Sequence, residues 1–286
     1  MAATEGQRSN PDICLATLRE TDRDRYLACL LAPEDKRRPL AALYGFHAEL
    51  ARIRDLVHEP LPGEVRLQYW RDLLEGQSHG STEANPLASE LLRAIEAHRL
   101  PRATLINMID ARIFDLYDDP MENRNALEGY AGETASALIQ LAGLVLSPED
   151  AMQSSHAAGH AGVAQAIAGC LLLMPLHRHR GQLYLPLDIL TAVGLDRQAF
   201  LDGKDVARIG AAIDAFVGLG HEHLAKARAS GSLPKDLVPA FLPVALVGPT
   251  LRRARALGAG VLDQPFQPPQ WRRQLSMAIA AVRGKF

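Results

Sequence analysis

Hydrophobic side chains recur at spacings of three and four residues along nearly the whole chain, which is the period of an amphipathic α-helix. The first clear run begins after Pro33, where Glu34 and Asp35 supply the acidic residues that favour a helix N-terminus. Its apolar positions are Leu40, Leu43, Tyr44, Leu50, Ile53 and Val57. Because proline disrupts a helix interior, we expect this helix to end before Pro60 and the next to begin at Glu64.

The same pattern continues through the rest of the chain. Further helices are predicted at residues 85–98, 101–117, 123–147, 149–173, 206–229, 234–258 and 269–283. The stretch Gly76–Asn85 has a loop composition, and no segment alternates with the two-residue period of a strand. We therefore expect an all-α, single-domain helical bundle of about eight to ten helices spanning residues 1–286. Its core would cover about residues 20–260, followed by a C-terminal helix at 269–286.

The longest uncharged stretch, Ala151–His177, raises the question of a membrane span. A spanning helix needs about 20 predominantly apolar residues. This stretch contains Gln153, His156 and Pro175, and its first half is not hydrophobic. We therefore predict a helix buried in the protein core, together with the equally uncharged segment Thr134–Leu146.

Composition and charge exclude several classes of protein. The 31 Lys and Arg residues against 33 Asp and Glu give a net charge of −2, without the basic surplus typical of nucleic-acid binders. The three cysteines, Cys14, Cys29 and Cys170, lack C-x-x-C spacing, which favours a reducing compartment. Residues 1–10 are polar and show no secretory signal. We expect a cytoplasmic protein, with peripheral attachment to the inner membrane left open.

Three polar clusters each allow more than one interpretation. His156 and His160 have the i, i+4 spacing of zinc ligands on a helix, but the sequence places no third ligand, so a metal site is not expected. Residues 177–180 (His-Arg-His-Arg) predict a basic loop, either solvated or holding a phosphate. The three aspartates within residues 115–119 indicate an acidic helix end, with metal binding as the alternative.

Five segments together resemble the squalene/phytoene synthase family. In chain order they are residues 22–28 (DRDRYLA), 36–38 (KRR), 41–46 (AALYGF), 130–135 (YAGETA) and 181–188 (GQLYLPLD). Each motif alone is weak, but their order and spacing are typical of the family over about residues 20–230. The resemblance implies an isoprenoid-synthase helical fold and the head-to-head joining of two prenyl diphosphates.

That chemistry, as the resemblance implies it, uses two aspartate-rich motifs on facing helices. Aspartates at i and i+4 share one helix face, and two opposed faces can hold Mg²⁺ ions that bridge substrate phosphates. In this sequence the family's arginine before the first motif falls on Ala48. Its three aspartates fall on Ala51, Arg52 and Asp55, so one carboxylate is left.

The second motif is lost altogether. Its arginine becomes Leu172, its aspartates become Leu173 and His177, and its glutamate becomes Leu176. The family's next arginine becomes Gln182. Metal ions supply several kcal/mol of charge stabilisation, and about 1.36 kcal/mol is tenfold in rate. Loss of both clamps therefore predicts a fall of many orders of magnitude in turnover.

One branch of the family is similar in lacking these aspartates and in carrying a proline-containing segment with a histidine, as in residues 172–177. The branch includes an assembly factor of mitochondrial respiratory complex I and bacterial relatives, which residues 55–72 also resemble. The resemblance implies a non-catalytic assembly or lipid-binding protein without a cofactor. Its partner would be a respiratory-complex subunit or an isoprenoid-like lipid, and not nucleic acid.

The alternative is an active prenyl-diphosphate transferase with an altered site that still uses Mg²⁺. The candidate pocket residues are Tyr44, Arg52, Arg54, Asp55, His177 and Tyr184. Arginines can hold a diphosphate without a metal, so binding without turnover is also allowed. Because Asp55 shares its helix with Arg52 and Arg54, an ion pair explains it more simply than a metal site does.

The C-terminal segment differs from the rest because it contains no acidic residue from Gln264 onward. Its apolar residues near one helix face are Trp271, Leu275, Ile279, Val282 and Phe286, and its cations are Arg272, Arg273, Arg283 and Lys285. A short basic amphipathic helix is typical of peripheral membrane contact. Packing of the same stripe onto the domain is an equal alternative.

Overall fold

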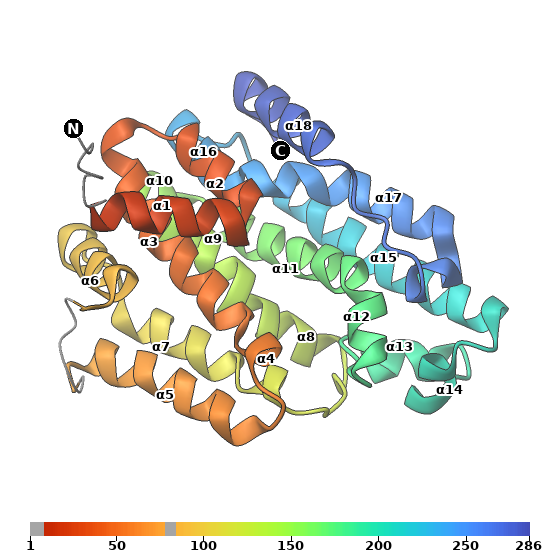
Figure 1. Cartoon of the computed structure of the whole chain (residues 1–286). Helices are drawn as coiled ribbons and strands as arrows, with labels where there is room; N and C mark the ends of the chain where they lie inside the picture. Colours follow the sequence, from red (N-terminus) through yellow and green to blue (C-terminus); the bar gives the residue numbers. More distant parts are fainter. Residues whose placement is uncertain (1–8, 78–83) are drawn as a thin grey trace, which may run out of the picture.

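The computed structural model describes residues 9–77 and 84–286, and within these ranges the chain is helical without a strand (Figure 1). The first half contains α1 (Asn10–Thr21), α2 (Arg23–Leu30), α3 (Glu34–Ala51), α4 (Ile53–Leu56), α5 (Pro60–Glu75), α6 (Pro86–His98), α7 (Arg102–Ala111), the 3₁₀ turn η2 (Phe114–Leu116), α8 (Arg124–Ala131), the π-helical turn η3 (Gly132–Ser136) and α9 (Ala137–Leu146). The prediction of an all-α protein is confirmed.

The second half contains α10 (Pro148–Gln153), α11 (Ser155–Leu172), α12 (Met174–His179), α13 (Leu187–Ala192), α14 (Arg197–Asp202), α15 (Val206–Ala229), η4 (Lys235–Leu237), α16 (Val238–Phe241), η5 (Leu242–Leu246), α17 (Val247–Leu257), η6 (Gly258–Leu262) and α18 (Gln270–Arg283). The predicted loop Gly76–Asn85 and the N-terminal residues 1–10 lie largely outside the described residues.

The centre of the bundle is built on α11, which packs along α15 and also contacts α9, α17 and η3 (Figure 1). Small side chains such as Ala158, Ala161 and Ala164 are buried there and let the helix axes approach closely. The buried side chains form one continuous hydrophobic cluster from Leu18 to Ala280. The prediction that α11 is a buried core helix is confirmed, and no described helix is long and apolar enough to cross a membrane.

The predicted helix at 123–147 is interrupted by the π-helical turn η3. Thr134 Oγ1 donates a hydrogen bond to the Tyr130 carbonyl (2.6 Å), and Ser136 Oγ donates to the Gly159 carbonyl of α11 (2.7 Å). The close approach is possible because Gly162 of α11 has no side chain facing Ser136. π turns of this kind are rare and are often found at functional sites.

Several other boundaries differ from the expected ones. Helix α5 begins at Pro60 and not at Glu64, because proline is tolerated in the first helical turn. The predicted helix 149–173 is split at Ser154 into α10 and α11. The predicted helix 234–258 is divided into four short segments, with Pro239 near the start of α16 and Pro243 near the start of η5. Residues 177–180 are not a loop, because they complete the last turn of α12. Proline at these positions removes a backbone donor, so helical turns can begin there but not continue through.

Candidate functional site

The positions of the two lost aspartate motifs face each other across the bundle. The first lies at the junction of α3 and α4, and the second lies on α12 and the end of α11. Arg180 Nη2 lies 2.7 Å from Asp55 Oδ1, joining the two. The prediction that Asp55 is an ion-pair partner is confirmed, and the one carboxylate left at these positions is neutralised by an arginine.

The two arginines beside Asp55 are also held by neighbouring groups. Arg52 Nη1 lies 3.8 Å from Glu49 Oε2 at the surface. Arg54 Nη1 donates to the Val57 carbonyl (3.2 Å), and its Nη2 lies 3.8 Å from Asp118 Oδ1. These guanidinium groups therefore do not converge on a shared pocket with Asp55.

Below this rim lies a buried polar network centred on Asp115. Tyr184 donates to Asp115 Oδ1 (2.7 Å), and Tyr130 donates to the same oxygen (2.9 Å). Arg112 Nη1 donates both to Asp115 Oδ2 (2.9 Å) and to the Tyr130 hydroxyl (2.8 Å). Gln182 Nε2 donates to the Asp115 carbonyl (2.9 Å). The buried Asp115 carboxylate thus accepts hydrogen bonds from three separate parts of the chain, which stabilises a closed arrangement.

Two histidines flank this network. His47 Nε2 lies 3.1 Å from Arg112 Nη2, and because arginine can only donate, this nitrogen must accept. Burial, reinforced by Arg25 and Arg112, holds the pKa of His47 well below its usual value. The His177 ring lies against Tyr184 with centroids 4.5 Å apart, and burial lowers the pKa of His177 to about 4 although Asp115 opposes the shift. Both imidazoles are therefore neutral at pH 7.

The lowered pKa of His177 predicts a pH-dependent stability. Between pH 6.5 and about 4 the unfolded chain binds a proton here and the folded chain does not, so the free energy of unfolding falls as the pH is lowered through this window. The part of the free energy of unfolding that depends on neutral His177 is fully present above about pH 6.5. It is lost as the pH falls to about 4, and the loss amounts to about 3 kcal/mol at most. Urea unfolding of His177→Gln should show a shallower fall than wild type. The exposed His179→Gln is the control, and equal slopes for wild type and His177→Gln would contradict the assignment.

The structure divides the six candidate pocket residues among different places. His177 and Tyr184 border the buried network, Arg54 and Asp55 lie at its rim, and Arg52 is at the surface. Tyr44 is buried, with its hydroxyl without a hydrogen-bond partner in the described part of the chain. None of the six lines either of the two cavities described below. No sequence pattern pointed to Arg112, and the acidic run predicted a helix end where Asp115 is buried. The only sequence signal for this network was the presence of Tyr130 and Tyr184 in two of the family segments.

A large cleft of about 920 Å³ opens on another side of the second motif. It is bounded by the α1–α2 junction, the end of α11, α17 and α18. Leu172 and Leu173, at motif positions, line it instead of filling it. Five arginines line the cleft: Arg23, Arg25, Arg253, Arg272 and Arg273.

The arginines of this cleft differ in how they are paired. Arg273 pairs with Asp24, and Arg25 pairs with Asp22 at 2.5 Å. The other three are exposed and make no ion pair with any described residue. The cleft therefore combines apolar side chains with five arginines against three acidic lining residues, Glu20, Asp22 and Asp24, and this positive surplus suits an anionic amphiphile.

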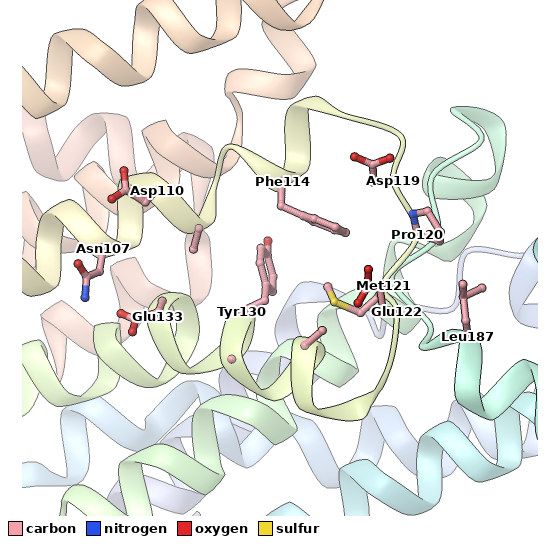
Figure 2. A pocket seen from close by; sticks show the side chains of 13 residues that line it. Asn107, Asp110, Phe114, Asp119, Pro120, Met121, Glu122, Tyr130, Glu133 and Leu187 are labelled. Atoms are coloured by element: carbon pink, nitrogen blue, oxygen red, sulfur yellow. The ribbon is translucent and has the colours of Figure 1, made fainter.

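A second cavity of about 780 Å³ lies between α7 and α8, with Phe114 and Tyr130 near its centre (Figure 2). Its carboxylates are Asp110, Asp119, Glu122 and Glu133. Tyr130 therefore contributes its ring to this cavity and its hydroxyl to the buried network. Asp110 pairs with Arg71. Among the described residues, no three carboxylate, histidine or cysteine side chains are grouped as ligands of one metal ion would be.

The histidine pair on α11 has a neighbour that the sequence could not place. His160 Nδ1 lies 3.0 Å from His223 Nδ1 of α15, and His223 Nε2 lies 3.4 Å from Glu128 Oε1. His156 contacts His160 edge to face, with centroids 4.7 Å apart. A hydrogen bond between the two Nδ1 atoms requires at least one of them to be unprotonated.

The sequence profile of the squalene/phytoene synthase family matches residues 18–278, which is most of the chain. The chain belongs to the squalene/phytoene synthase family. Solved structures of this fold are similar: a dehydrosqualene synthase superposes with a TM-score of 0.81 at 16% identity, covering 96% of each chain. The squalene synthase HpnC from Alicyclobacillus acidocaldarius has a TM-score of 0.64 at 15% identity, covering 97% of this chain and 95% of that one. The expected isoprenoid-synthase fold is confirmed.

Curated family relatives are more similar in sequence than these structures. A protein of Rattus norvegicus named NADH dehydrogenase (ubiquinone) complex I, assembly factor 6, is 32% identical over 96% of this chain and 82% of its own length. The Homo sapiens protein of the same name is 31% identical over 93% of this chain and 80% of its own length. The Drosophila melanogaster homolog is 27% identical over 85% of this chain and 74% of its own length. The resemblance to the complex I assembly branch is confirmed.

Proposed function

We propose that this family member is non-catalytic and assists the assembly of a respiratory NADH dehydrogenase complex by binding one of its subunits. The names of its curated relatives, with about one third identity over most of the chain, support the assembly role. The loss of both aspartate motifs supports the absence of turnover, because ionisation of a diphosphate needs several kcal/mol of charge stabilisation from bound metal.

The ion pair between Asp55 and Arg180 is the observation that carries this proposal. In a metal clamp, the carboxylate would face a cation bridged to the substrate phosphates. Here Arg180 Nη2 lies 2.7 Å from Asp55 Oδ1, and the aspartate positions of the second motif hold Leu173 and His177. The same ion pair explains why an aspartate can be kept at position 55 without binding a metal.

A single variant, Asp55→Asn, separates the proposal from the enzymatic alternative. Purified wild-type protein incubated with Mg²⁺ and farnesyl or geranylgeranyl diphosphate should form no head-to-head product above a protein-free blank, measured by mass spectrometry. In cells of the source organism that lack this chain, wild type and Asp55→Asn should restore assembled NADH dehydrogenase equally, as seen on native gels. Magnesium-dependent product that disappears in Asp55→Asn would establish the transferase instead.

The arginine-lined cleft favours a second candidate function, the binding of an anionic isoprenoid amphiphile without turnover. Its apolar residues include Leu172 and Leu173, and its surplus of arginines over acidic residues matches the negative charge of a diphosphate. Calorimetric titration of geranylgeranyl diphosphate in the same protein samples tests this candidate. Arg253→Gln should weaken binding about tenfold, whereas Arg252→Gln on the same helix, outside the cleft, should not.

A further inference from the structure

Helix α18 has two distinct faces, and one of them has no partner. It lies at the outer edge of the bundle, where it packs on η5 and α2 (Figure 1). Its inner face is firmly attached: Met277 and Ala280 are buried against the domain, and Arg273 pairs with Asp24 of α2. The helix therefore packs onto the domain through residues other than the apolar stripe identified in the sequence, and the alternative that the stripe itself packs onto the domain is wrong for Trp271, Leu275, Ile279 and Val282.

The chain beyond α18 is attached as well. The Phe286 ring stacks on Phe241 with centroids 5.1 Å apart, and Arg228 Nε donates to the Phe286 carbonyl (2.9 Å). Phe286 thus leaves the apolar stripe that the sequence suggested and joins the core. The helix is held at both ends, so its outer face has a fixed orientation.

The outer face of α18 is apolar and exposed. Trp271, Leu275, Ile279 and Val282 have exposed fractions of 60, 52, 41 and 90%. Their spacing of four, four and three residues places them on one stripe, opposite Met277 and Ala280. A single exposed apolar residue is ordinary on a protein surface. Four in an unbroken stripe on one rigid helix indicate a surface that contacts an apolar phase.

The charges along this segment indicate what that phase is. Residues 264–286 contain no acid, and Arg272 and Arg283 lie along one edge of the stripe, followed by Lys285. A partner protein would have to supply matching carboxylates along that same edge. An anionic lipid surface supplies negative charge beside an apolar interior, and tryptophan is favoured at that boundary.

We propose that α18 docks the protein onto an anionic lipid bilayer, lying in the headgroup region with Trp271, Leu275, Ile279 and Val282 against the acyl chains. This inference does not depend on the proposed assembly function. Arg272 borders both the stripe and the cleft, and Gln270 and Ser276 of the same helix line that cleft. Docking through α18 therefore places the opening of the arginine-lined cleft beside the lipid headgroups.

Vesicle co-sedimentation of the full chain tests the proposal. Wild type should bind vesicles that contain phosphatidylglycerol, bind pure phosphatidylcholine vesicles weakly, and dissociate as salt is raised. The double variant Leu275→Gln, Ile279→Gln should reduce partitioning at least about tenfold. The matched control is Leu61→Gln, Val65→Gln on α5, which removes two apolar residues of the same i, i+4 spacing and similar exposure, 69 and 64%, and should bind like wild type.

Two further measurements keep the result decisive. Val282→Gln, at the most exposed position of the stripe, should weaken binding without changing the thermal unfolding midpoint, so a folding defect in the double variant would not obscure the answer. Trp271 emission should shift to shorter wavelength with anionic vesicles, and Trp271→Phe should remove the shift while the buried Trp70 remains. The proposal fails if wild type does not bind anionic vesicles, if both double variants bind equally, or if the stripe instead mediates a dimer that Leu275→Gln, Ile279→Gln dissolves.

Discussion

Alanine in place of Gly162 is expected to destabilise the protein by at least about 3 kcal/mol, or to prevent its folding. A Cβ atom at this position of α11 would lie 2.3 Å from the backbone nitrogen and Cα of Ser136. The obstacle is main chain in the π-helical turn η3, so no side-chain rotation relieves it. Separation of the two helices would also break the hydrogen bond from Ser136 to the Gly159 carbonyl.

The matched control for this variant lies one turn earlier on the same helix. A Cβ on Gly159 would meet no heavy atom within 4 Å. Because alanine is a better helix former than glycine by about 1 kcal/mol, Gly159→Ala should leave stability unchanged or raise it by up to that amount. Urea unfolding followed by circular dichroism compares the three proteins. A Gly162→Ala midpoint equal to that of wild type would disprove the close packing of η3 on α11.

Asp115→Asn is expected to lower the free energy of unfolding by about 3 kcal/mol or more at pH 7. The substitution preserves shape but removes the negative charge that faces Arg112 at 2.9 Å in the buried network. Arg112 then lies in the interior without a negatively charged partner. Tyr130 and Tyr184 cannot supply the negative charge, because burial raises the pKa of both phenols far above neutrality and they stay protonated. An uncompensated buried charge is among the largest penalties a point substitution can impose.

Asp118 supplies the comparison for Asp115. Both belong to the acidic run at residues 115–119, but the Asp118 side chain is 56% exposed and its contact with Arg54 is 3.8 Å. Asp118→Asn should change stability by less than about 1 kcal/mol, as is typical of exposed ion pairs. Chemical denaturation of the two variants should differ clearly; similar losses from both would show that the network around Asp115 is not the buried charge centre described above.

The helical architecture was predictable because each helix carries its own three- and four-residue hydrophobic period. Breaks inside long apolar runs were not predictable in the same way. Ser154 and the π turn at Gly132–Ser136 interrupt helical segments without a proline, so the local pattern does not mark either position. The π turn depends on tertiary packing, because it lies against Gly162 of α11.

In the candidate site, too, features set by local sequence were predictable and long-range contacts were not. Alignment to family motifs located the lost carboxylates and correctly gave Asp55 an ion-pair role. It could not pair Asp55 with Arg180, because that contact crosses from α4 to the residue after α12. Arg112 belongs to none of the family motifs, and the residues around Asp115 do not indicate that its side chain is buried. Long-range side-chain partners are decided by which helices meet, and that information is absent from the spacing of residues along one helix.

The contact between Asp55 and Arg180 has a consequence for any attempt to rebuild a metal clamp in this chain. Ala51→Asp would place a carboxylate where the family motif has one, beside Arg52, while Arg180 still pairs with Asp55. A metal ion at this position would lie beside the positive charges of Arg52 and Arg180, so one added carboxylate is not expected to create a metal site. An engineered metal clamp in this fold would therefore need the two arginines replaced together with the aspartates restored.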